Sequence, residues 1–224
     1  MERRTADVDR FWKDGILDTE TNVQFGEGGA GTFSDVKLTT CIKDFRIKKV
    51  LEEFVAAGAQ PEILYKAKPH IGSDVLREVV VNIRNKIIYL GGEIRFESRV
   101  TDFITDPQGR LAGVEVNGDE IINIQTVIAA PGHSARDTFA VMNGRGIPME
   151  QKPFSIGVRV EHLQSMINES QYGSFADRLP AADYKLAYRC KNGRGVYTFC
   201  MCPGGEVVAA ASSEGMMVTN GMSY

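Results

Sequence analysis

The chain has 224 residues, of which 43% are hydrophobic and 25% are charged, and its formal net charge at pH 7 is −3. This composition is typical of a globular protein with a buried core, and it excludes a disordered tail. The small net charge argues against a nucleic-acid-binding or membrane-surface protein. Because no apolar run resembles a secretory signal or reaches membrane-spanning length, the sequence predicts a cytoplasmic protein.

Helical patterns dominate the first part of the chain, beginning with a short helix expected around residues 8–12. A second helix is indicated by apolar residues that recur at the spacing of one helix face, namely Ile47, Val50, Leu51, Phe54 and Val55. Gly58 supplies its C-terminal stop. A third helix is predicted from Ser73 to the glycines at 91 and 92, and its apolar stripe is expected to pack on a sheet.

The pattern then changes to the period of β-strands. Residues 94–100 alternate, and residues 111–116 and 120–124 form a predicted hairpin around the tight turn at Asn117 and Gly118. The continuous apolar run at 126–130 predicts a parallel strand that is buried on both faces and ends at Pro131.

The second half of the sequence is typical of antiparallel structure. Strands are predicted at residues 155–160, 184–188, 195–202 and 207–212, with turns between them. A short helix and a loop are expected within residues 162–178. A shift in composition near residues 140–153 is the candidate domain boundary.

Four cysteines are too few and too scattered to indicate a disulfide scaffold. Cys200 and Cys202 form the one close pair, and their side chains would share a face of a strand. A metal or redox site is one interpretation of this pair, and packing in the core is the other. Without a second Cys or His pair at ligand spacing, core packing is favoured and no metal site is predicted.

The most informative stretch is the glycine-rich loop that opens residues 26–40. Glycines lack a Cβ, so their backbone N–H groups can approach an anion or a planar ring closely. Thr32, Ser34 and Lys37 can donate hydrogen bonds to phosphate or carbonyl oxygens. Gly26, Gly28 and Gly31 match the Gly-x-Gly-x-x-Gly spacing, but no apolar strand precedes them, so a glycine-rich surface turn is the alternative.

This loop, the helix, the strand with its meander and the apolar strand ending in Ala-Pro-Gly-His-Ser together resemble the flavin domain of two-dinucleotide-binding flavoproteins. Residues 22–35 and 132–137 are similar to a bacterial family of FAD-dependent dehydrogenases, as are residues 154–162 and 195–205. The resemblance implies an α/β fold that becomes α+β in its second half. It implies a partial Rossmann-like FAD-binding sheet in residues 1–145 and a mainly antiparallel substrate or cap domain in residues 146–224.

The resemblance also implies the cofactor-binding residues. Those expected to line FAD from the first loop are Gly28, Gly29, Ala30, Gly31, Thr32, Phe33, Ser34, Asp35 and Lys37. The main chain of Val100 would read the adenine, with plain sheet packing as the alternative. Ala130, Gly132 and His133 would lie beside FAD at the end of the apolar strand, and a solvated or capping role is the alternative for the histidine.

No catalytic residue is assigned, because the flavin itself would carry the hydride chemistry. Arg159, Glu161 and His162 alternate out of a predicted strand and could hold a polar substrate, although a solvated strand face is favoured.

The family pattern usually has glycine where this chain has Val36, which does not easily adopt a positive φ angle.

The family also begins with a strand, a Gly-x-Gly-x-x-Gly turn and a ribose-binding acid, none of which precedes Met1. It continues past the equivalent of Tyr224. The chain is therefore interpreted as an internal fragment that lacks the N-terminal unit. FAD binding by the fragment alone is expected to be weak or absent, and sheet edges left without partners are expected to drive homo-oligomerisation.

The sequence thus predicts part of an FAD-dependent oxidoreductase that transfers hydride to or from flavin on a small-molecule substrate, with NAD(P) as a candidate electron partner. The alternative is a non-catalytic α+β binding or assembly module that has lost its cofactor domain. Retention of flavin separates the two hypotheses.

Overall fold

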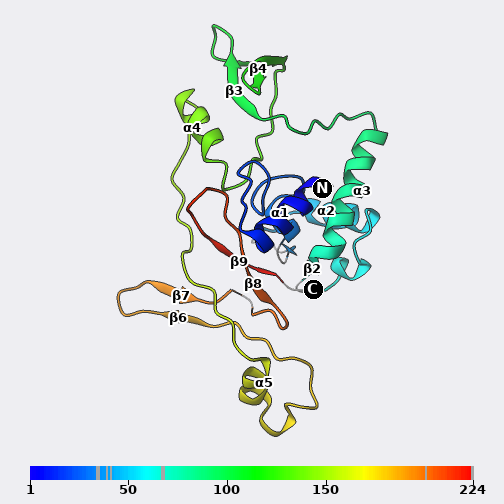
Figure 1. The fold of residues 1–224 in the computed structure, drawn as a ribbon, viewed down its shortest axis with the longest axis vertical. Helices are drawn as coiled ribbons and strands as arrows, with labels where there is room; N and C mark the ends of the chain where they lie inside the picture. The colour runs from blue at the N-terminus through cyan, green and yellow to red at the C-terminus, as the bar shows by residue number, and fades with distance from the viewer. Residues whose placement is uncertain (34–35, 39, 41, 67–68, 200, 223–224) are drawn as a thin grey trace. The chain divides into compact units, whose positions relative to one another are not determined.

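The computed structural model describes residues 1–33, 36–38, 40, 42–66, 69–199 and 201–222. The chain divides into two compact units, one made of Met1–Val81 with Val158–Tyr224 and the other of Asn82–Gly157. Figure 1 shows the ribbon of both. The boundary predicted between residues 145 and 146 is a functional one, between a cofactor domain and a substrate domain. The division into compact units does not test it, so it stays a prediction.

The helices of the first unit confirm the helical periodicity of the sequence. Helix α1 is Glu2–Asp14, α2 is Arg46–Ala56, and α3 is Ser73–Tyr89, which continues into the second unit. Gly15 ends α1 in the left-handed conformation at φ 72°, and its N–H donates to the Phe11 carbonyl. This is the usual C-terminal role of glycine, which has no Cβ to clash there. The short 3-10 helices η1 and η2 are Ala30–Phe33 and Pro61–Leu64.

Within the residues that the structure describes, the strands of the first unit form three two-stranded antiparallel sheets. Strand β1, Val36–Lys37, pairs with β2, His70–Ile71. Strand β6, Ala187–Arg189, pairs with β7, Gly195–Tyr197, and β8, Glu206–Ala209, pairs with β9, Thr219–Met222. Helix α5 is Gln164–Tyr172 and is followed by the 3-10 turn η3, Gly173–Phe175.

The core of the first unit joins the two ends of the sequence. Val8, Val23, Phe33 and Ala210 are fully buried in one cluster, and Trp12 packs against it. The Trp12 Nε1–H donates to the Ala209 carbonyl at 2.9 Å. The Gln24 Nε2–H donates to the Ala210 carbonyl at 3.0 Å. These contacts hold α1 and the loop after it against β8 (Figure 1).

The second unit is built on an antiparallel meander of β3, Val100–Thr105, β4, Leu111–Val116, and β5, Glu120–Asn123. The turn between β4 and β5 has positive φ at Asn117 and Gly118, as the sequence predicted for a tight hairpin. Phe103, Val114 and Val116 form its core. Helix α4, Arg136–Gly144, is followed by Arg145, which makes an ion pair with Asp102 of β3.

The predicted mixture of helix and sheet is confirmed, but several strand predictions were wrong. The strand expected at residues 94–100 begins only at Val100, and residues 126–130 and 155–160 are in no strand. Ile128 is 91% exposed and Ile156 is 92% exposed. An apolar alternation becomes a strand only where a neighbouring strand takes its backbone hydrogen bonds, and every pairing among the described residues is antiparallel. A Rossmann-like parallel sheet is therefore not formed by the described part of the chain.

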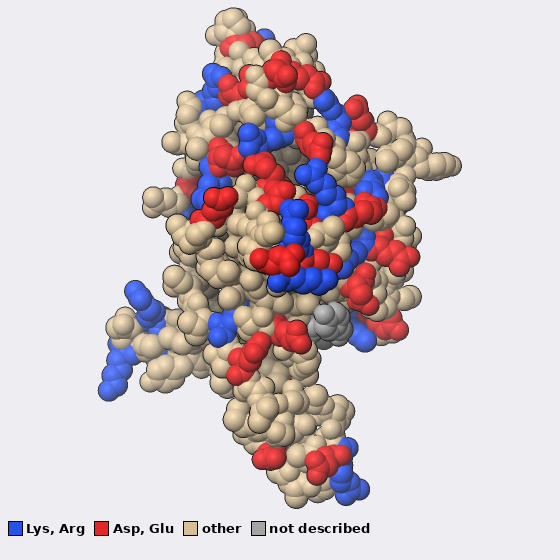
Figure 2. All heavy atoms as spheres, viewed as in Figure 1, with Lys and Arg blue, Asp and Glu red and all other residues tan. Residues whose placement is uncertain are grey.

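Other elements agree with the sequence only in their position. The predicted strands at 184–188 and 195–202 correspond to β6 and β7, and 207–212 corresponds to β8, with different bounds. Helix α4 and strand β9 were not predicted. Among the described residues, no helix has the length and apolarity needed to cross a bilayer. Figure 2 shows basic and acidic side chains interspersed over the described residues of the face it draws.

Candidate functional site

The glycine-rich loop forms a tight turn that leads into η1. Gly26, Gly28 and Gly29 have φ angles of 114°, 85° and 68°, in the region that favours glycine. The Gly29 N–H donates to the Gly26 carbonyl at 3.0 Å, and the Thr32 N–H donates to the Gly29 carbonyl at 3.3 Å. Gly28, in the middle of this turn, and Gly29, at its end, are both exposed.

The surroundings of the three glycines differ. A Cβ on Gly28 would lie 2.3 Å from Thr32 Oγ1 and 3.1 Å from a Val80 methyl carbon. A Cβ on Gly26 would lie 2.6 Å from Arg4 Cδ, whereas a Cβ on Gly29 would meet no atom of the described residues within 4 Å. Packing inside the protein therefore requires glycine at positions 26 and 28. Gly29 is the position where the backbone is open to an approaching molecule.

Arg4 of α1 binds the backbone of this loop through hydrogen bonds. Its side chain is buried, with 3% of the residue exposed, and its Nε–H donates to the Asn22 carbonyl at 2.9 Å. One terminal nitrogen donates to the Glu27 carbonyl, and the other to the carbonyls of Val23 at 3.0 Å and Gly29 at 2.9 Å. Burial lowers the pKa of Arg4 to about 10, with Glu27 acting in the opposite direction. The guanidinium therefore stays charged at neutral pH and binds four carbonyls of one segment.

Phe33 lies between the loop and the core. Its ring is fully buried, and the guanidinium carbons of Arg4 and Arg77 lie 4.9 Å and 4.7 Å from its centroid. Trp12 contacts it edge to face, with centroids 6.2 Å apart. Such contacts of cations and rings with an aromatic face are favourable and orient the ring.

Thr32 Oγ1 and Arg77 Nε, which belong to residues next to the loop glycines and the Phe33 ring, are buried and have no hydrogen-bond partner among the described residues. Because the side chains of Thr32 and Phe33 are fully buried, a molecule at the loop surface would meet the backbone of this segment rather than these side chains. Ala30 and Gly31 lie at the start of η1 and are half-buried.

The remaining cofactor-binding predictions fall outside this loop. Ser34 and Asp35 lie outside the described residues. The backbone of Lys37 pairs with that of His70 in the β1–β2 sheet. Val100 begins β3 opposite Val116.

The predictions near the Ala-Pro-Gly-His-Ser motif fall in the second unit, as does Val100. Ala130 is exposed, and Gly132 has φ 85° with open space where a Cβ would stand. His133 is exposed and contacts the Phe154 ring at a centroid distance of 6.2 Å. The structure thus brings together the residues of the first loop, and these further residues stay predictions.

The polar residues at 159–162 have separate partners within the first unit. An Arg159 terminal nitrogen donates to Asn220 Oδ1 at 3.0 Å, and the Val207 N–H donates to Glu161 Oε1 at 2.6 Å. His162 Nε2 lies 2.9 Å from the Tyr184 hydroxyl, and its Nδ1 is buried without a hydrogen-bond partner in the described part of the chain. Arg159 and Glu161 therefore contact the β8–β9 pair, and the three side chains do not converge on one point through these contacts.

Two residues of the loop site were missed by the sequence reasoning, Arg4 and Arg77. The available signal for Arg4 was its place one helical turn before Val8, on the face of α1 that is buried. A charged residue on an apolar helix face indicates either a buried polar contact or a flexible side chain that reaches solvent, and the sequence does not distinguish these.

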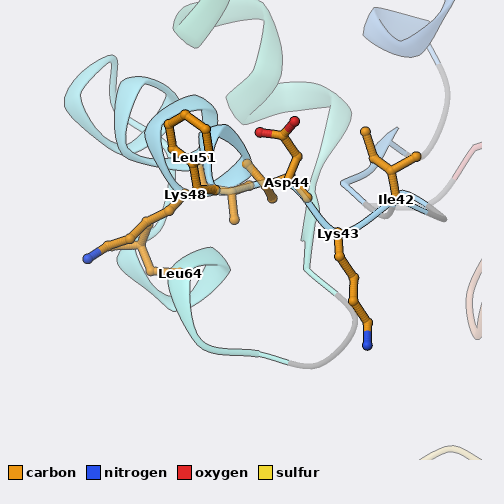
Figure 3. Close-up of a pocket in the computed structure, with 8 residues that line it drawn as sticks. Ile42, Lys43, Asp44, Lys48, Leu51 and Leu64 are labelled. Carbon is orange, nitrogen blue, oxygen red and sulfur yellow. The ribbon is translucent and has the colours of Figure 1, made fainter.

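A hollow of the first unit lies elsewhere, at the start of α2. It has a volume of about 820 Å³, and Figure 3 shows the side chains around it. It is lined by Ile42, Lys43, Asp44, Phe45, Ile47, Lys48, Leu51 and Leu64. Arg46 donates hydrogen bonds to Asp44 and lowers its pKa. None of the predicted cofactor residues that the structure describes lines this hollow.

Comparison with known proteins adds an independent indication that the chain is associated with FAD. Residues 153–224 match the family model described as "FAD-dependent protein, C-terminal domain-like". The whole chain is 53% identical, over 227 aligned residues, to an uncharacterized protein of Clostridium beijerinckii, and the alignment covers 42% of that relative. The chain therefore spans less than half the length of the relative it matches. The family match supports an FAD-dependent protein.

Proposed function

We propose that the chain is part of an FAD-dependent oxidoreductase in which the loop at residues 26–33 lies against the flavin nucleotide. One observation carries the proposal. Ala210 belongs to the segment that matches the FAD-dependent family, and it shares a buried cluster with Phe33 at the end of the loop. The segment that matches the family, residues 153–224, therefore packs against the glycine-rich loop, which the sequence predicts to bind the cofactor.

The described residues fit a flavin nucleotide at the level of the backbone. The loop presents Gly29 with open space where a side chain would stand, so a planar or anionic group can reach the main chain there. Thr32 Oγ1 is a buried hydroxyl beside Gly28, without a partner among the described residues. FAD would supply the hydride chemistry, and the protein would supply binding and orientation.

The substrate in this proposal is a small molecule, and catalysis belongs to the complete protein. The proposal leaves out NAD(P), which neither the comparisons nor the described residues support. His133, Gly132, Ala130 and the main chain of Val100 remain proposed neighbours of the cofactor, on the resemblance alone.

Titration of FAD into the purified chain, followed by flavin fluorescence, tests the proposal. Of the two outcomes that the sequence leaves open, weak binding or none, the proposal commits to weak binding, with a dissociation constant of roughly 10 µM to 1 mM, equivalent to about −4 to −7 kcal/mol. Gly29→Val should weaken it at least about tenfold, because a side chain would stand where the ligand approaches the backbone.

Gly15→Val is the matched control. Gly15 has φ 72° and Gly29 has φ 68°, and at both positions no atom of the described part of the chain lies within 4 Å of where a Cβ would stand. The two substitutions therefore carry the same backbone strain, and only the one in the loop should reduce FAD binding. Equal losses in both variants would assign the effect to folding. A folded wild-type chain that shows no binding at about 1 mM FAD would contradict the proposal and favour the non-catalytic module.

A further inference from the structure

The contacts of Arg4 determine which way the peptide groups of the loop point. Its guanidinium accepts no hydrogen bond and donates to the carbonyls of Asn22, Val23, Glu27 and Gly29. In a trans peptide the C=O and the following N–H point in opposite directions. All described peptide bonds are trans. Since the Glu27 carbonyl points toward the guanidinium, the N–H of Gly28 points away from it.

The Gly28 N–H thus points away from the guanidinium, and the residue is exposed. Among the described residues it has no hydrogen-bond partner, whereas the N–H groups of Gly29 and Thr32 are used within the turn. The nearby hydroxyl of Thr32 is fully buried and also lacks a partner there. Two unused donors therefore lie close together, because Thr32 Oγ1 is within 2.3 Å of where a Gly28 Cβ would stand.

We propose that Arg4 is a positioning residue, which holds the loop carbonyls inward so that the Gly28 N–H faces an oxygen of the flavin nucleotide. This inference rests on the proposed function. Arg4 does not touch the ligand itself, because its guanidinium is buried and occupied by the carbonyls. The recognised oxygen belongs either to the phosphates or to the carbonyls of the flavin ring, and both accept a hydrogen bond.

Lysine cannot replace arginine in this role. The guanidinium has five N–H donors in a planar fork, whereas an ammonium has three donors around one point. Lysine at position 4 would keep the charge, but its three N–H donors are fewer than the four carbonyls that Arg4 contacts, so at least one of these contacts would be lost. The loop would then lose its fixed conformation while the hydrophobic cluster of Val8, Val23 and Phe33 stayed in place.

The experiment compares Arg4→Lys with Arg77→Met. Arg77 contacts the same Phe33 ring, but its Nε has no hydrogen-bond partner among the described residues, so its loss should leave the loop carbonyls undisturbed. We expect amide exchange at residues 26–33 to rise at least about tenfold in Arg4→Lys, with the FAD dissociation constant rising by a similar factor. Both values should change less than about threefold in Arg77→Met.

Measurements on the wild-type chain keep the test independent of whether a variant folds. FAD should slow the exchange of the Gly28 amide and leave that of Gly15 unchanged. ADP carries the phosphates without the ring, and riboflavin carries the ring without the phosphates. Whichever of the two protects Gly28 identifies the oxygen.

The outcomes separate the two proposals. Absence of FAD binding by the wild-type chain would overturn the proposed function, and this inference with it. FAD binding that leaves Gly28 exchange unchanged, or that is unaffected in a folded Arg4→Lys variant, would overturn the role of Arg4 alone. A faster-exchanging loop in Arg4→Lys with unaltered FAD affinity would make Arg4 a purely structural residue.

Discussion

Substitution of Gly28 and Gly29 by alanine separates backbone strain from steric overlap in the loop. Both residues have positive φ, at 85° and 68°, so each alanine costs about 1–2 kcal/mol for a left-handed conformation. Only the Cβ at position 28 also overlaps Thr32 Oγ1, at 2.3 Å, and approaches Val80. Overpacking of this kind adds about 1–3 kcal/mol. The expected loss of unfolding free energy is therefore about 2–5 kcal/mol for Gly28→Ala and about 1–2 kcal/mol for Gly29→Ala.

Trp12 provides the assay, because it is the one tryptophan of the chain and packs against the buried cluster of the first unit. Urea unfolding followed by its fluorescence reports the stability of this unit, and an unchanged slope shows that the unfolding transition is comparable among variants.

A double-mutant cycle tests the steric part of the argument. Thr32→Ala removes Oγ1 and makes room for the new Cβ, so Gly28→Ala should cost about 1–3 kcal/mol less in the Thr32→Ala background. Thr32→Val keeps an atom in the place of Oγ1 and should give no such relief. Equal costs for Gly28→Ala and Gly29→Ala, within about 0.5 kcal/mol, would refute the reasoning, as would the absence of coupling to Thr32→Ala.

Three further predictions concern packing, charge and exposed apolar segments. Val8→Ala should destabilise the first unit by about 2 kcal/mol in the Trp12 assay because Val8 is fully buried, whereas Val50→Ala, at a position 53% exposed, should cost less than about 0.5 kcal/mol. Hydrogen bonding from Arg145 lowers the pKa of Asp102 below its ordinary 3.8, so this pair stabilises the second unit above that pH and the contribution is lost as the pH falls through the lowered pKa. Asp102→Asn should accordingly cost at most about 1 kcal/mol at pH 7, since the pair is partly exposed, and progressively less as the pH falls through the lowered pKa. Amide exchange in β3 measures this cost, and an effect that is equal at neutral and at acid pH would contradict the assignment. We also expect the chain to self-associate through apolar segments such as 126–130 and 155–160, which lie outside any strand, and light scattering that shows a monomer at tens of micromolar would contradict this.

The sequence predicted those elements whose conformation depends mainly on their own residues. The apolar spacing of α2 and α3, the glycine at the end of α1 and the Asn117–Gly118 turn are set by periodicity and by backbone conformations that few residues adopt. The glycine-rich loop was also predictable as a place where the backbone is exposed, and Gly28 and Gly29 are indeed exposed there.

The tertiary structure alone decided what depends on distant neighbours. The apolar run at 126–130 predicts a buried strand, but a strand needs partners for its backbone groups, and no local pattern says whether those partners are present. Trp12 bonds to Ala209 across 197 residues of sequence, which no periodicity indicates. Arg4 shows this most clearly. The sequence around it indicates only a charged residue on an amphipathic helix. The fold alone supplies the four carbonyls that make the burial of its side chain favourable.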